Sequence, residues 1–160
     1  MQIAIVEDIT SEREHLKAEL DVQLARLSLN AVTFEYASGS DFLAAAGKER
    51  FDLVFLDIYM GNENGVDTAR ALRRFDEDCM LVFTTTSTDH ALEGFRVRAF
   101  HYLVKPCTEA DMAALFDEII KRLPAGDRYI EVNAAGGPVR LRFREILYAE
   151  HHQHQIYIYR

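Results

Sequence analysis

Short apolar runs alternate with stretches of helical period from residue 2 to about residue 123. The runs indicate strands, and the stretches between them repeat apolar residues three and four positions apart, as amphipathic helices do. The expected strands are 2–7, 31–37, 51–57, 80–85 and 99–104, and the expected helices are a segment that opens at Thr10, 38–47, 65–75, 89–97 and 108–123. This alternation predicts an α/β fold with a five-stranded, parallel, doubly wound sheet.

The first expected helix carries an opening signal and a buried stripe. Thr10-Ser-Glu-Arg-Glu14 matches a capping box, in which a hydroxyl and a carboxylate bind the free N–H groups of the first turn. Leucines then recur at helical spacing and predict the stripe; they are Leu16, Leu20, Leu24 and Leu27.

Side chains that could bind a metal or take part in a reaction stand where four of the expected strands end. Glu7 and Asp8 close the first strand, Asp57 closes the third, Thr85 closes the fourth, and Lys105 follows the fifth. The carboxyl ends of parallel strands meet at one edge of an open sheet, and such sheets bind their ligands there. We therefore expect these groups to form one site for a divalent metal and a phosphoryl group.

Acids at one edge would repel a phosphodonor, so we expect a cation between them. Mg²⁺ prefers oxygen ligands, usually one or two carboxylates together with phosphate and water. Asp8 and Asp57 are the expected carboxylate ligands, and Glu7 would act behind them or through a water. The backbone carbonyl of Tyr59 would join them if the loop turns there.

The remaining groups suit phosphoryl transfer. Lys105 would be the charged partner of the phosphoryl group, and the Thr85 hydroxyl would donate to one of its oxygens. Asp57 would be the nucleophile and would form an acyl phosphate. A single acid after a strand is more often a turn former or a helix cap, so the prediction depends on four strand ends carrying complementary groups.

Several motifs together resemble the receiver domain of two-component response regulators. They are Glu7-Asp8, Leu-Asp57-Ile, Val-Phe-Thr84-Thr85, Ala91-Leu-Glu-Gly-Phe95 and Tyr102-Leu-Val-Lys105-Pro106, and the resemblance covers residues 1–123. It implies a flavodoxin-like fold, dependence on Mg²⁺ and phosphorylation of Asp57 by a sensor histidine kinase. It also implies that Thr85 and Tyr102 are a switch pair and that the Lys105-Pro106 bond is cis. It leaves open a homodimer formed on phosphorylation.

The segment 58–65 departs from the family pattern, and nothing in it can continue the strand that ends at Asp57. The family usually has proline where Gly61 stands, and we expect a looser loop for lack of it. Glu63 replaces a methionine and is expected to add negative charge near the metal. Thr86 stands where alanine or serine is common, and its larger side chain is expected to restrict access to the acyl phosphate.

The pattern changes at Pro124-Ala-Gly126, where alternation of period two replaces the mixed pattern. The short strands expected after this point are 129–133, 139–143 and 155–159. We therefore predict a receiver domain over 1–123, a linker over 124–128 and a second module over 129–160.

The second module resembles the opening of a LytTR-type DNA-binding domain, most closely at Ile146-Leu-Tyr-Ala-Glu150. Since only the opening part is present, we expect a truncated β segment, a longer natural protein, and DNA as the partner of its full output domain. His154 is the candidate DNA-contact residue. An unrelated closing hairpin is the alternative. His151, His152 and His154 also suggest zinc, but no further ligand is placed nearby, which favours a loop or strand edge.

Charge separates the two modules. The chain has 160 residues and a net charge of −8. Residues 124–160 hold four acids and five arginines, a net of +1, so the remainder carries −9 and is not expected to bind nucleic acid nonspecifically. No apolar run approaches the ~20 residues that cross a bilayer, and no signal peptide precedes the first strand, so we expect a cytoplasmic protein without membrane contact. Cys79 and Cys107 are expected to be reduced, partly buried thiols.

Other functions fit the sequence less well. A receiver that acts alone through protein–protein contacts is the main alternative. An aspartyl-phosphate phosphatase of the haloacid dehalogenase type needs an aspartate two residues after its nucleophile, and Tyr59 stands there. A flavodoxin needs a phosphate loop rich in serine and threonine after its first strand, where Glu7 and Asp8 would repel phosphate. We therefore expect a signalling protein rather than an enzyme.

Overall fold

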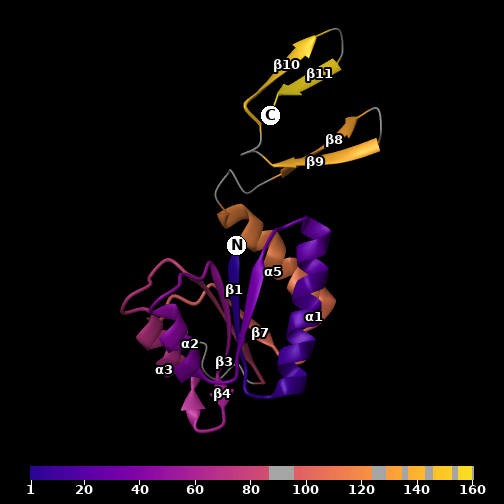
Figure 1. Cartoon of the computed structure of the whole chain (residues 1–160). Helices are drawn as coiled ribbons and strands as arrows, with labels where there is room; N and C mark the ends of the chain where they lie inside the picture. The colour runs from indigo at the N-terminus through magenta and orange to yellow at the C-terminus, as the bar shows by residue number, and fades with distance from the viewer. Residues whose placement is uncertain (87–95, 124–128, 135–136, 143–145, 153–154, 160) are drawn as a thin grey trace. The chain divides into compact units, whose positions relative to one another are not determined.

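A computed structural model describes residues 1–86, 96–123, 129–134, 137–142, 146–152 and 155–159 (Figure 1). The chain divides into two compact units, Met1–Leu115 and Phe116–Arg160. The first unit contains the sheet and most of the helices, and the second contains two β hairpins.

A five-stranded parallel sheet forms the centre of the first unit. Its strands are β1 (Gln2–Val6), β2 (Val32–Tyr36), β3 (Leu53–Asp57), β6 (Met80–Thr85) and β7 (His101–Val104). Their order is β2-β1-β3-β6-β7, and every neighbouring pair is parallel. Every residue of β3 is buried, as its continuous apolar run predicts for a central strand covered on both faces. The predicted flavodoxin-like, doubly wound fold is confirmed.

Helices cover both faces of this sheet (Figure 1). They are α1 (Thr10–Leu27), α2 (Gly39–Ala46), α3 (Gly65–Leu72) and α5 (Glu109–Arg122). Helices α2 and α3 lie on one side, and α1 lies on the other with the start of α5 (Figure 1). The predicted helix 89–97 falls mostly outside the described residues. Among those residues, every helix is too short or too polar to cross a bilayer.

The start of α1 differs from the predicted capping box. Ile9 is the N-cap residue and makes no side-chain cap, and Thr10 is already helical. The Ile9 N–H donates instead to Oε1 of Glu7 at 3.1 Å. The acid at the end of β1 therefore does part of the work expected of the capping box.

The buried stripe of α1 contains Leu16, Leu20, Gln23 and Leu27, whereas the predicted Leu24 is only partly buried. The reason is geometric. At 3.6 residues per turn, each step of four advances about 40° around the helix, so two such steps carry Leu24 off the stripe. Gln23 takes its place, and its Oε1 accepts a hydrogen bond from Nε of Arg26 at 2.7 Å.

Strand β3 ends at Asp57, as predicted, and a small antiparallel hairpin that the sequence did not predict follows it. Strand β4 (Tyr59–Met60) pairs with β5 (Glu63–Asn64). Gly61 turns the chain with φ +50°, a conformation that proline, with φ near −65°, cannot adopt. The glycine in the usual proline position therefore turns a paired hairpin, and the looser loop expected there stays a prediction.

The second unit contains two antiparallel hairpins besides the end of α5. The first joins β8 (Tyr129–Ala134) to β9 (Gly137–Arg142), and the second joins β10 (Tyr148–His152) to β11 (Gln155–Tyr159). Strand β10 was not predicted as a strand. The Tyr148 and Tyr159 rings stack across the second hairpin at 4.4 Å. The predicted linker 124–128 lies outside the described residues, and the domain boundary there stays a prediction.

Gly65, the first residue of α3, lies against the site-bearing strand. A Cβ at Gly65 would run into the backbone carbonyl of Asp57, and the Gly65 N–H donates to the Ile58 carbonyl at 2.9 Å. Only a glycine lets the start of α3 come this close to the end of β3.

We expect Gly65→Ala to lower the free energy of unfolding by about 1–3 kcal/mol, because the new methyl group must push the backbone aside. Urea denaturation followed by circular dichroism measures this. Gly47→Ala is the control, since Gly47 has helical dihedrals and its added Cβ meets nothing closer than 3.6 Å. Equal unfolding midpoints for the two variants would contradict the close approach at Gly65.

Candidate functional site

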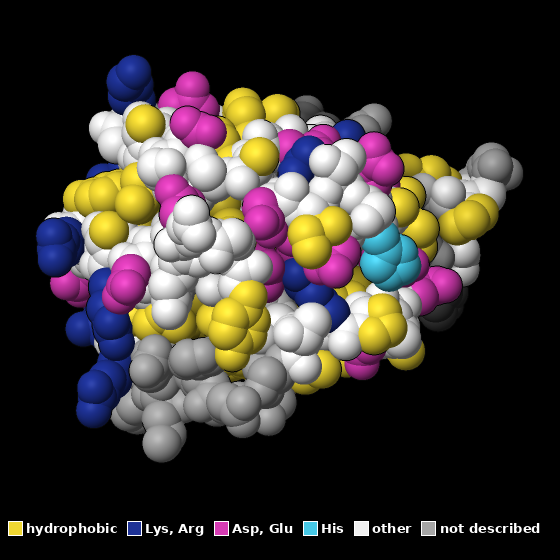
Figure 2. Space-filling model, turned by 90° about the horizontal axis from the view of Figure 1, so that it is seen from below, with side chains coloured by type: hydrophobic (Ala, Val, Ile, Leu, Met, Phe, Trp, Pro, Cys, Tyr) yellow, Lys and Arg dark blue, Asp and Glu magenta, His cyan; other side chains and the backbone are white. Residues whose placement is uncertain are grey.

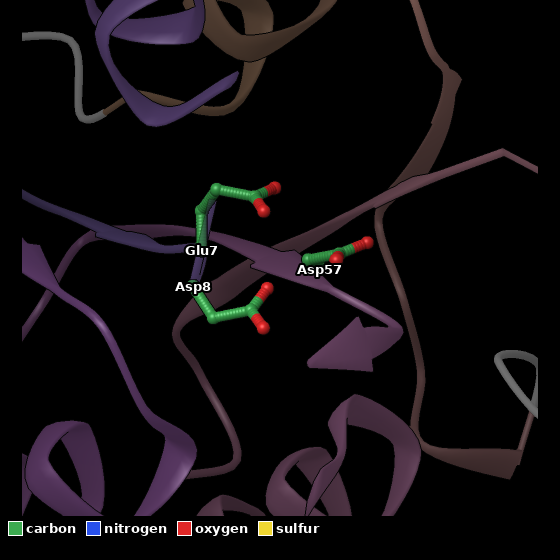
Figure 3. Close-up of side chains that lie close together, drawn as sticks. All are labelled: Glu7, Asp8 and Asp57. Atoms are coloured by element: carbon green, nitrogen blue, oxygen red, sulfur yellow. The ribbon is translucent and has the colours of Figure 1, made fainter. Parts of the chain in front are cut away.

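Three acids from two neighbouring strands meet at the carboxyl edge of the sheet (Figure 3). Glu7 and Asp8 follow β1, and Asp57 ends β3, which pairs with β1. One carboxylate oxygen from each lies within 4.8 Å of the others. The same face of the molecule shows acidic side chains gathered near its centre, next to basic ones (Figure 2). The structure thus brings together the three acids that the sequence predicted.

The three acids differ in depth. Glu7 is 1% exposed and Asp57 is 3% exposed, whereas Asp8 is exposed. The Asp8 carboxylate lies beside the turn of the hairpin, where an added Cβ on Gly61 would be 3.6 Å from it. A group arriving from solvent therefore meets Asp8 first and finds Asp57 below it.

Lys105 joins the acids from the end of β7. Its Nζ donates to Oε2 of Glu7 at 2.5 Å and to Oε2 of Glu12 at 2.5 Å, and it lies 3.2 Å from Oδ1 of Asp57. Its backbone N–H donates to the Thr85 carbonyl at 2.8 Å, and the Lys105-Pro106 bond is cis, as expected. One ammonium group thus connects three carboxylates from three elements.

Burial and pairing act against each other on the ionisation of these groups. Burial raises the pKa of Asp57 above its usual range, although Lys105 and the backbone hydrogen bonds of Tyr59 and Ile58 lower it. Burial likewise raises the pKa of Glu7, and the bond to Lys105 opposes it. For Lys105, burial lowers the pKa, but its carboxylate partners outweigh burial and hold it above the usual range. Ionising these acids inside the site therefore costs free energy.

The oxygen-rich cluster fits a divalent cation. Four carboxylates, from Glu7, Asp8, Glu12 and Asp57, outnumber the ammonium of Lys105. Hard cations take such carboxylate oxygens as ligands, and a bound cation would relieve the repulsion that burial makes costly. The carbonyl of Tyr59 was a predicted ligand. Tyr59 lies in β4, two residues after Asp57, and pairs with Asn64.

The consecutive threonines of β6 lie on alternating faces of the sheet. Phe83 and Tyr102 pair across β6 and β7, with ring centroids 5.2 Å apart, on the α2–α3 side of the core. Thr85 is fully buried and, two residues after Phe83, lies on that same face. The structure therefore places the predicted switch residues Thr85 and Tyr102 on one face of neighbouring strands.

Comparison with known proteins agrees with this architecture. The family model of the response regulator receiver domain matches residues 3–117. The chain belongs to this family. The response regulatory domain of protein mrkE from Klebsiella pneumoniae has a similar structure, with a TM-score of 0.67 and 26% identity over 76% of this chain and 97% of that one. CheY4 of Vibrio cholerae reaches a TM-score of 0.59 at 25% identity, over 77% of this chain and 98% of that one.

Two regulators are similar in sequence. Transcriptional regulatory protein YpdB of Escherichia coli (strain K12) is 29% identical over 119 residues, which are 74% of this chain and 47% of that protein. Sensory transduction protein LytT of Enterococcus faecalis is 29% identical over 138 residues, which are 86% of this chain and 54% of that protein. The chain spans about half the length of these relatives.

Glu12 is a residue of this receiver domain that sequence reasoning missed. It lies in the first turn of α1 and binds Lys105 as closely as Glu7 does. The sequence places it in a helix opening, where acids are common because they favour the positive end of the helix dipole. Only the position of α1 beside the end of β7 shows its contact with Lys105.

The Glu63 carboxylate binds the start of α2, and its predicted effect on the charge near the metal stays a prediction. Its Oε2 accepts the Gly39 N–H at 2.5 Å, and its Oε1 accepts the Ser40 hydroxyl at 2.7 Å. The carboxylate thus serves the first turn of α2, where an anion is stabilised by the helix dipole. Glu63 is also absent from the acidic cluster identified among the described residues.

A cavity of about 330 Å³ opens beside Lys105. It is lined by Glu7, Ser11, Glu12, His15, Leu16, Thr84, Thr86, Lys105, Pro106 and Cys107. Thr86 is exposed at this cavity, so its predicted effect on access concerns this side of the site. The Thr84 hydroxyl is buried without a hydrogen-bond partner in the part of the chain that the structure describes.

The remaining predicted residues are histidines of the second module and two cysteines. His154 is not among the described residues, and neither are the side chains of His151 and His152. Cys79 and Cys107 are free and buried, and burial raises their pKa to about 12 and about 11. Both thiols therefore stay protonated near neutral pH.

The raised pKa of Glu7 makes stability depend on pH. An acid that binds its proton more tightly in the folded state stabilises the fold below its unfolded pKa and loses this contribution as pH rises through the folded value. Without metal, we expect the stability of Glu7→Gln relative to that of the wild type to rise from about pH 4.5, the ordinary pKa of a glutamate, towards neutrality. Urea denaturation over this range measures the difference. A constant or shrinking difference would contradict the cost of burying the Glu7 charge.

Proposed function

We propose that this receiver domain accepts a phosphoryl group on Asp57 from a sensor histidine kinase in the cytoplasm, with Mg²⁺ bound beside it. The observation that carries the proposal is the position of Lys105 Nζ, 3.2 Å from Oδ1 of the buried Asp57 inside an acidic cluster. A structural ion pair would need no surplus of carboxylates. A phosphoryl acceptor needs both a cation for the anionic group and acids for a metal.

Each side chain has a separate task in this proposal. A carboxylate oxygen of Asp57 attacks phosphorus, a P–O bond forms, and the P–N bond to the kinase imidazole breaks with its electron pair going to nitrogen. Lys105 then stabilises the negative phosphoryl oxygens. Asp8, Asp57 and the Tyr59 carbonyl would hold Mg²⁺, with Glu7 behind them, and the ion would offset charge on the transferred group.

The switch would lie on the α2–α3 face of the sheet. The Thr85 hydroxyl would turn towards the phosphoryl group, and the Tyr102 ring would follow, changing the surface beside β7. The shared face of Thr85, Phe83 and Tyr102 supports this pairing. Formation of a homodimer after phosphorylation remains part of the proposal.

We also propose that residues 129–160 are the first part of a LytTR-type DNA-binding output domain, joined to the receiver by 124–128. The support is the pattern of the chain after residue 124 and the likeness to YpdB, which is named a transcriptional regulator. A receiver acting alone through protein–protein contacts is the second candidate. The exposed Tyr59 in the position of the missing acid argues against the phosphatase.

Acetyl phosphate with Mg²⁺ tests the acceptor. We expect one phosphoryl group on the wild type and none on Asp57→Asn, because the amide cannot act as the nucleophile. Intact-protein mass spectrometry measures the added mass. Asp8→Asn should label more slowly, and a chelator should abolish labelling, since both weaken metal binding. Full labelling of Asp57→Asn would refute the assignment.

DNA binding tests the output. We expect the full-length protein to bind a promoter repeat with an affinity that falls about 10³-fold or more between 50 and 200 mM salt, because binding releases counterions from phosphates. Fluorescence anisotropy of a labelled promoter fragment measures the affinity. Absence of binding at low salt would favour the receiver that acts through protein contacts.

A further inference from the structure

Lys105 has no hydrogen-bond donor to spare for a phosphoryl group. An ammonium has three N–H donors, and three carboxylates contact Nζ of Lys105: Glu7 and Glu12 at 2.5 Å and Asp57 at 3.2 Å. The two glutamates hold the ammonium more closely than the phosphoacceptor does. A phosphoryl group on Asp57 can take the donor that faces Asp57, but it can gain a second bond to Lys105 only if the contact with Glu7 or Glu12 opens.

Burial decides which contact opens. The side chains of Glu7 and Asp57 are 1% and 4% exposed, whereas that of Glu12 is 39% exposed. Glu7 is held further by its bond from the Ile9 N–H, and Asp57 carries the phosphoryl group itself. Glu12 borders both solvent and the cavity beside Lys105, so its carboxylate has space to turn away and water to solvate it.

We propose that Glu12 is a positioning residue that competes with the phosphoryl group for Lys105 and so slows phosphorylation of Asp57. The inference rests on the proposed function of Asp57 as phosphoacceptor. Before transfer, Glu12 holds the ammonium towards α1, and after transfer it releases the ammonium to the phosphoryl oxygens. Breaking the bond between Glu12 and Lys105 thus adds to the activation barrier of each phosphoryl transfer.

A simpler role for Glu12 is to stabilise the start of α1. An acid in the first turn of a helix interacts favourably with the helix dipole, whatever it contacts. That role predicts a change in stability but no change in reactivity at Asp57. The two roles therefore separate in a kinetic measurement, and only competition requires Lys105.

Glu12→Gln tests the competition through the rate of phosphorylation by acetyl phosphate with Mg²⁺. We expect the rate constant to rise about two- to fivefold, which corresponds to the loss of a half-exposed ion pair. Glu14→Gln is the matched control, because it removes the same charge from an exposed position two residues along α1. It should leave the rate unchanged. Glu12→Ala should accelerate the reaction like Glu12→Gln, so the test does not depend on one variant.

A double-mutant cycle with Lys105→Gln shows whether Glu12 acts through the lysine. In that background we expect Glu12→Gln to leave the rate unchanged. Equal acceleration with and without Lys105, or equal rates for Glu12→Gln and Glu14→Gln, would overturn the inference while leaving Asp57 as the acceptor. A wild-type chain that takes no phosphoryl group would overturn the proposed function and this inference together.

Discussion

The arrangement at the carboxyl edge of the sheet depends on the ammonium of Lys105, whose positive charge offsets the negative charge of buried carboxylates. Taking Glu7 and Asp57 out of water is unfavourable, and burial raises the pKa of both. Pairing with Lys105 opposes this, yet the acids still outnumber it. Such an arrangement is poorly optimised for stability alone. It becomes reasonable if a cation and an anionic group are expected to arrive, since each would offset a charge left unbalanced.

Two glycines shape the backbone next to the acids. Gly61 turns the hairpin below Asp8 with a positive φ, and Gly65 lets α3 begin directly against the carbonyl of Asp57. Glu63, on the same hairpin, is engaged by the first turn of α2 and does not add to the cluster. The two departures from the usual family residues thus lie in one hairpin, where Gly61 forms a turn in place of the proline and Glu63 binds the start of α2 in place of the methionine.

The fold of the first unit was predictable because its strands are short, apolar and separated by helical periods. The strand ends were equally readable, since a parallel sheet collects its carboxyl ends at one edge whatever the loops do. Small differences in the angular position of a residue around a helix could not be predicted from the sequence. The leucine spacing points to Leu24, but the drift of successive four-residue steps buries Gln23 instead. The hairpin β4–β5 is too short to leave a periodic pattern at all.

The sequence by itself determined which groups stand at the end of each strand: acids after β1, an acid at the end of β3, threonines on β6 and a lysine after β7. Alternating polarity and strand length are local properties, so they can be predicted without knowing which elements pack against each other. Only the tertiary structure decided which groups compete for Lys105. Glu12 and Lys105 are 93 residues apart, and their contact depends on how α1 packs beside the end of β7. No local pattern encodes that packing, because many side chains along both elements contribute to it.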